Sequence, residues 1–82
     1  LITDLLEDPE EEIIWLTTYG GGLHRLDKRQ NKIDFIPLNI KGKKAVALNC
    51  LIETHDETLW LGGADSLLRI NKQTLKSESL RL

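Results

Sequence analysis

This chain of 82 residues has few of the groups that cross-link small domains: it contains one cysteine, two prolines, no methionine and 5% aromatic residues. The single Cys50 excludes an internal disulfide, and no CxxC or His/Cys spacing indicates a structural zinc site. At this length a domain buries a small fraction of its surface, so a chain without such cross-links is marginally stable. We expect no metal site, no cofactor and at most one small domain.

Strong charge and long apolar runs are also missing. The net charge of −2 gives no general attraction to nucleic-acid phosphates. The basic run at Lys41, Lys43 and Lys44 lacks interleaved aromatic residues and is interpreted as a solvated connector. No apolar run approaches the length of a membrane span. We expect no nucleic-acid partner and no direct membrane contact, and the absence of an initial methionine or a signal sequence indicates a piece of a longer protein.

One phrase occurs twice in the chain. "IIWLTTYGGGLHRLD" at residues 13–27 aligns with "TLWLGGADSLLRIN" at residues 58–71, which places Trp15 on Trp60 and Arg25 on Arg69. The length differences between the copies are confined to "EDPEEE" against "ETHDE" and "TTYGGG" against "GGADS". These stretches are predicted to be loops, because an extra residue within a strand would turn every following side chain to the other face.

Each copy is predicted to form four short strands separated by turn signals, and no segment has a sustained helical period. The expected strands cover residues 2–7, 13–17, 22–27 and 32–37 in the first copy, and 46–53, 58–62, 66–71 and 75–82 in the second. The runs "IIWL" and "ALNCLI" are apolar at every position or nearly so, which indicates sheets covered on both faces. We therefore predict an all-β chain of two four-stranded antiparallel blades, residues 1–40 and 41–82, from a larger β-propeller.

The extended phrases "EDPEEEIIWLTTYGGGLHRLD" and "ETHDETLWLGGADSLLRIN" resemble the two-component regulator propeller repeat. The resemblance implies the periplasmic sensor region of a hybrid two-component histidine kinase of Bacteroides-type bacteria, anchored in the inner membrane. Its expected ligand is an oligosaccharide, its output is control of polysaccharide-utilisation genes, and its partners are neighbouring blades of the parent chain. The family usually has glycine in the tight turn before the tryptophan, where Glu12 and Glu57 stand here, so the turn type stays open.

Two other classes of protein fit the strand pattern. The chain could supply non-catalytic blades of a propeller enzyme, such as a polysaccharide lyase or hydrolase, or part of a protein-interaction propeller. An enzyme would need acids or bases on the channel-facing strands, which offer mainly Thr3, Asp4, Asn49 and Cys50. The acidic run "EDPEEE" lacks the spacing and glycine of a calcium loop and is interpreted as a solvated hairpin tip. We predict no catalytic residue in this segment.

Positions that differ between the copies are the best candidates for ligand contacts. Tyr19, in the longer glycine loop, and Asp65, in the corresponding loop of the second copy, are predicted to contact a ligand. His24, which aligns with Leu68, is expected to be packed and hydrogen-bonded.

Positions that repeat are predicted to be architectural. Trp15 and Trp60 are expected to pack between blades. Arg25 and Arg69 are expected to make a repeated contact, with acids of the Glu7 and Glu53 class as candidate partners.

Two blades share one interface and leave two outer faces bare. We expect both outer faces to be apolar, so that the isolated chain associates with copies of itself through blade faces or edge strands. The residues predicted to make the bare faces apolar are Ile14, Trp15, Leu16, Leu59, Trp60 and Leu61.

Overall fold

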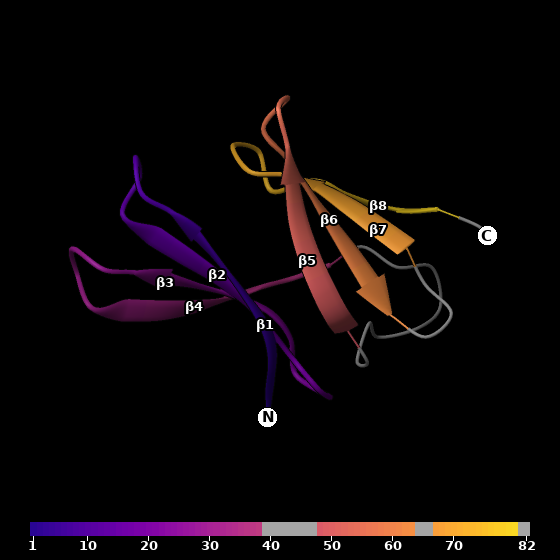
Figure 1. Cartoon of the computed structure of the whole chain (residues 1–82), viewed down its shortest axis with the longest axis horizontal. Helices are drawn as coiled ribbons and strands as arrows, with labels where there is room; N and C mark the ends of the chain where they lie inside the picture. The colour runs from indigo at the N-terminus through magenta and orange to yellow at the C-terminus, as the bar shows by residue number, and fades with distance from the viewer. Residues whose placement is uncertain (39–47, 64–66, 81–82) are drawn as a thin grey trace.

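The computed structural model describes residues 1–38, 48–63 and 67–80, and these fold into two four-stranded antiparallel sheets without a helix (Figure 1). Both sheets are meanders, in the strand orders β1-β2-β3-β4 and β5-β6-β7-β8. Sheet 1 comprises β1 (Ile2–Asp8), β2 (Ile13–Thr18), β3 (Gly22–Asp27) and β4 (Lys32–Ile36), and sheet 2 comprises β5 (Leu48–Thr54), β6 (Thr58–Gly63), β7 (Leu67–Asn71) and β8 (Ser77–Leu80). The predicted all-β class with two four-stranded antiparallel sheets is confirmed, and the sheets have the form of propeller blades.

The strand bounds differ from prediction mainly at β8. Residues 75 and 76 were expected within this strand, but Leu75 has a positive φ of 63° and belongs to the preceding turn. The side chain of Asn71 holds that turn by accepting hydrogen bonds from the backbone N–H groups of Gln73 and Thr74, at 2.8 and 2.9 Å. The predicted strand ends at residues 46, 66 and 82, and the blade boundary between residues 40 and 41, lie outside the described residues.

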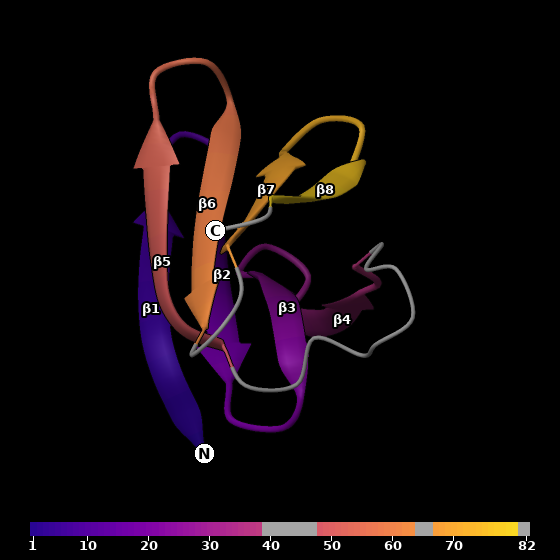
Figure 2. The same ribbon diagram turned by 90° about the vertical axis from the view of Figure 1, so that its right-hand side faces the viewer.

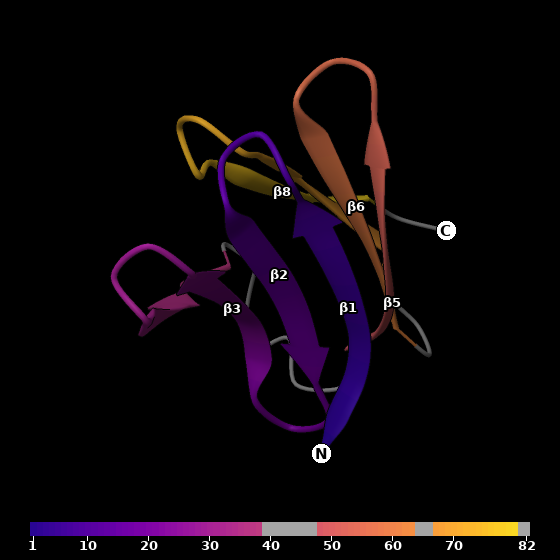
Figure 3. The same cartoon turned by 60° about the vertical axis from the view of Figure 1, so that its left-hand side comes forward.

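The two sheets approach each other most closely at their first strands. β5 packs against β1 and β2, and Figures 1, 2 and 3 all place β1 and β5 next to each other. Figures 2 and 3 show these two strands pointing the same way. Sheet 2 therefore repeats sheet 1 as the next layer in a stack, with the same strand direction at the inner edge.

An apolar core fills the space between the sheets. Because β2 pairs with β3 in a fixed register, Trp15 and Leu23 lie on one face of sheet 1, and this face points to sheet 2. Alternating residues of β6 and β7 supply the other half of the core. The buried hydrophobic residues of this core are Trp15, Leu23, Ile36, Leu48, Leu51, Leu59, Leu61, Leu68 and Ile70.

The two tryptophans occupy opposite surroundings. Trp15 is 2% exposed within the core, whereas Trp60 is half-buried on the face of sheet 2 that points away from sheet 1. The prediction that Trp15, Leu59 and Leu61 lie on bare outer faces is wrong, because all three are in the shared core. Each sheet thus turns its tryptophan face in the same direction along the stack.

Candidate functional site

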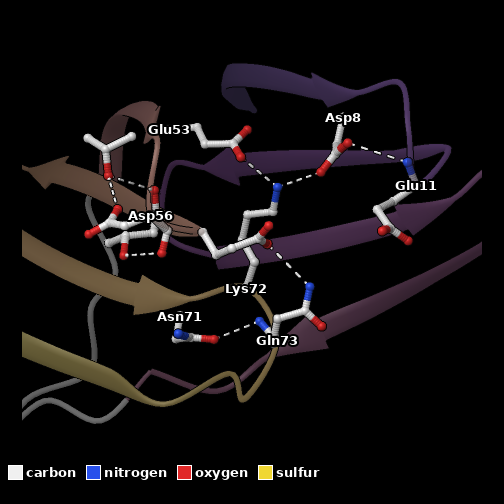
Figure 4. A network of polar contacts seen from close by, with 10 residues as sticks. Asp8, Glu11, Glu53, Asp56, Asn71, Lys72 and Gln73 are labelled. Carbon is white, nitrogen blue, oxygen red and sulfur yellow. Dashed lines mark hydrogen bonds and ion pairs between the residues drawn. The ribbon is translucent and has the colours of Figure 1, made fainter.

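The least exposed ion pair of the described residues lies where the two sheets meet at one end. The Lys72 ammonium is 2.5 Å from Asp8 Oδ2 and 2.6 Å from Glu53 Oε2 (Figure 4). Asp8 ends β1 in sheet 1, whereas Glu53 is in β5 and Lys72 follows β7 in sheet 2. The side chains of Lys72 and Asp8 are 8% and 11% exposed. This cluster therefore joins the two sheets by a largely buried ion pair.

Local hydrogen bonds orient both charged partners. Asp8 Oδ1 accepts a 3.4 Å bond from the backbone N–H of Glu11, across the hairpin that Pro9 begins. The backbone N–H of Lys72 donates to the Glu57 carbonyl at 2.9 Å, which ties the β7–β8 turn to the β5–β6 hairpin. The two charges are consequently presented by turns that are already held in place.

The pKa values of Asp8 and Lys72 are both shifted away from 7, that of Asp8 downward and that of Lys72 upward. The hydrogen bond from Lys72 holds the pKa of Asp8 below its usual value of 3.8, against the opposing effect of burial. Burial by itself would lower the pKa of Lys72, but its bonds to Asp8 and Glu53 raise it to about 12. Since a general acid or base works best with a pKa near the working pH, neither Asp8 nor Lys72 suits proton transfer at pH 7.

A cleft of about 260 Å³ opens above the cluster. Its lining residues are Asp8, Pro9, Glu10, Glu11, Glu53, Glu57 and Lys72. Glu10 and Glu11 are exposed, as expected for a solvated hairpin tip, but Asp8 is buried and that part of the prediction is wrong. In the described part of the chain, no three His, Cys, Asp or Glu residues are grouped to hold a metal ion.

A second polar feature repeats in both sheets. In each sheet an arginine lies over the tryptophan of the neighbouring strand and reaches an acid on the last strand. The arginine carbon Cζ is 5.8 Å from the ring centre in sheet 1 and 5.9 Å in sheet 2. The members are Trp15, Arg25 and Asp34 in sheet 1 and Trp60, Arg69 and Glu78 in sheet 2.

The expected partners of these arginines are therefore corrected. Glu7 and Glu53 bind Lys28 and Lys72 instead, both at 2.6 Å. The reason is the register: Trp15, Arg25 and Asp34 lie directly opposite one another on one face of the sheet, while Glu7 pairs with Ile14.

The first strands use their polar groups to hold the sheets together. Thr3 Oγ1 donates to the Leu48 carbonyl at 2.8 Å, and Asp4 Oδ2 accepts the backbone N–H of Leu51 at 2.8 Å. These bonds satisfy a backbone carbonyl and a backbone N–H at the free edge of β5, which point away from β6. The residues that an enzyme would use on β1 are thus engaged in joining the sheets, whereas Asn49 and Cys50 are exposed.

The predicted ligand contact Tyr19 does not join the Asp8–Lys72 cluster. Tyr19 is 66% exposed and follows the far end of β2, and its backbone N–H donates to the Leu1 carbonyl at 2.9 Å. Asp65 lies outside the described residues.

His24 is packed as predicted, with its ring edge-to-face on Phe35 at 5.5 Å. Its buried Nδ1 has no hydrogen-bond partner among the described residues.

Sequence reasoning missed the inter-sheet pair of Asp8 and Lys72. A signal was present, because each copy has a lysine directly after Asp27 or Asn71 at the same place in the phrase. What distinguishes Lys72 from Lys28 is a carboxylate on the neighbouring sheet, 64 residues away in the chain.

Comparison with known proteins adds no assignment: no family model, curated protein or solved structure matches this chain. Among the described residues there is also no helix with the length and apolar character needed to cross a membrane.

Proposed function

We propose that the chain is a non-enzymatic pair of blades from the ligand-sensing propeller of a two-component sensor. The observation that carries this proposal is the doubled regulator-like phrase, whose two copies fold with the same tryptophan–arginine–acid register. On this proposal the parent is a hybrid histidine kinase with a periplasmic sensor region, and the ligand is an oligosaccharide. The sheets serve as a scaffold that presents loops at their ends.

The chemistry of the described residues favours binding over catalysis. Thr3 and Asp4 bond to β5, and the buried Asp8 and Lys72 neutralise each other. An exposed tyrosine beside three glycines remains as the best ligand contact, because an aromatic face stacks on a sugar ring and glycines let the backbone come close. The enzyme alternative would require its reacting groups on other blades.

Calorimetry with defined oligosaccharides of two to six sugars tests the proposal. We expect binding by the chain, weaker binding by Tyr19→Ala, and retained binding by Tyr19→Phe, which keeps the ring. The melting temperature of Tyr19→Ala should stay within about 2 °C of that of the unsubstituted chain, since an exposed loop residue contributes little to stability. Equal affinity of Tyr19→Ala and the unsubstituted chain would remove Tyr19 from the site.

The enclosing reading frame provides an independent test. We expect it to encode a transmembrane helix and a histidine kinase downstream of this segment. A complete frame with neither would refute the sensor proposal.

A further inference from the structure

The outer face of sheet 1 repeats the face of sheet 2 that is buried in the core. The alignment places Leu5, Ile14, Leu16 and Leu26 on sheet 1 at the positions of four core residues of sheet 2. Those core residues, Leu51, Leu59, Leu61 and Ile70, are at most 4% exposed. On sheet 1 no second sheet of the described residues packs on these positions: Leu5 is 56% exposed, and Ile14, Leu16 and Leu26 are half-buried by neighbours.

The outer face of sheet 2 repeats the face of sheet 1 that covers this core. Trp60 and Arg69 stand where sheet 1 has Trp15 and Arg25, with the same stacking of the guanidinium on the ring. Ile52 corresponds to Leu6, which packs against the core, yet Ile52 is 60% exposed. The chain therefore carries a second, unused set of both halves of its own internal interface.

We propose that copies of this chain associate head to tail. The outer face of sheet 2 of one copy, which carries Trp60, packs on the outer face of sheet 1 of the next copy, which carries Leu5. The internal contact between sheets 1 and 2 is the template for this junction. Because the two contacting faces are different, the contact is heterologous and leaves one free face of each kind after every addition. The assembly then grows as an open stack or closes into a ring, and this inference is independent of any sensing function.

The junction between copies is predicted to be weaker than the internal one. Three residues that bond across the internal interface, Thr3, Asp4 and Asp8, are replaced at the outer face of sheet 2 by Asn49, Cys50 and Thr54. Gly62 also stands where the Thr17 hydroxyl bonds to Thr3. Apolar contact and the Trp60–Arg69 stack remain, so association should depend on concentration in the micromolar range rather than be permanent.

Complementary face variants test the head-to-tail geometry. Leu5→Lys damages one outer face and Ile52→Lys the other, and both residues are more than half exposed, so each variant should fold. By light scattering at tens of micromolar, the unsubstituted chain should form species larger than a dimer, and each variant alone should be monomeric. An equimolar mixture should form a 1:1 dimer and nothing larger, because only one intact pair of faces remains. An unsubstituted chain that stays monomeric, or one variant that still dimerises by itself, would overturn the proposal.

Disulfide trapping gives a second readout. In the internal junction Asp4 lies against the backbone of Leu51, and the corresponding residues between copies are Cys50 and Leu5. Oxidised Leu5→Cys should give a ladder of dimers, trimers and tetramers, because each copy offers both thiols. Gln30→Cys, with its new thiol in an exposed turn, is the matched control and should give no ladder. A Leu5→Cys sample that stops at dimers would refute the heterologous contact.

Discussion

Replacing Lys72 with methionine tests whether the buried ion pair joins the two sheets. Methionine keeps most of the side-chain volume but leaves Asp8 and Glu53 as unpaired carboxylates in a largely buried site. Breaking a buried pair from one side costs about 3–5 kcal/mol, and the adjoining cleft reduces this to about 2–4 kcal/mol because water can reach the acids. Total stability for a chain of this length is about 4–12 kcal/mol, so the variant should lose a large share of it.

The matched control is Lys28→Met at the equivalent position of sheet 1. The Lys28 side chain is 36% exposed and, among the described residues, forms its ion pair with Glu7 of its own sheet, so its loss should cost about 0.2–1 kcal/mol. Urea unfolding followed by tryptophan fluorescence measures both, at a concentration low enough to keep the chain monomeric. We expect the midpoint of Lys72→Met to fall by about 1–2 M relative to the parent, and that of Lys28→Met by less than about 0.5 M.

Equal losses in the two variants would refute the reasoning, since burial and the contact with Asp8 are what distinguish Lys72. An Asp8→Asn change in the Lys72→Met background supplies a further check. Removing the unpaired charge of Asp8 should restore part of the lost stability. A further loss of stability would show that the unpaired charge is not the cause.

Three further predictions concern pH, backbone strain and the core. The stability advantage of the unsubstituted chain over Lys72→Met should be complete between about pH 5 and about pH 10.5. It should decline as the pH rises toward about 12, because the pKa of Lys72 is raised in the folded chain, and it should also be lost in acid, where Asp8 becomes protonated. An advantage that is unchanged from about pH 10 to about pH 12 by chemical unfolding would contradict the assignment. Glu57 has a positive φ of 64°, a conformation that favours glycine. Glu57→Gly should therefore raise the free energy of unfolding by about 0.5–1 kcal/mol and the melting temperature by about 2–6 °C. A lower melting temperature would show that the turn carries no strain. Trp15→Ala should cost about 3–5 kcal/mol and Trp60→Ala clearly less in the monomer, and the reverse order in urea unfolding would mean that the buried and outer faces have been confused.

The sequence predicts most of the strands well because each one is a short segment bounded by turn residues, and the inner ones are rich in apolar residues. The resemblance to the propeller repeat led us to expect glycine in the turn before each tryptophan, and Glu12 and Glu57 at these positions both have a positive φ, at 55° and 64°. Leu75 was assigned to a strand because leucine gives no local sign of a turn. The conformation there follows from Asn71, whose side chain closes the turn from four residues earlier.

Local sequence is enough to show that two copies of one four-stranded unit follow each other, since the alternation of side chains and the placing of the loops are local properties. The same alignment makes Trp15 and Trp60, like Arg25 and Arg69, equivalent positions. The burial of Trp15, the outward position of Trp60 and the pairing of Lys72 with Asp8 follow instead from how the two sheets pack. Equal local sequences pair within their own sheets in the same way, whereas burial and charge pairing depend on the neighbouring sheet, and each copy has that neighbour on a different side.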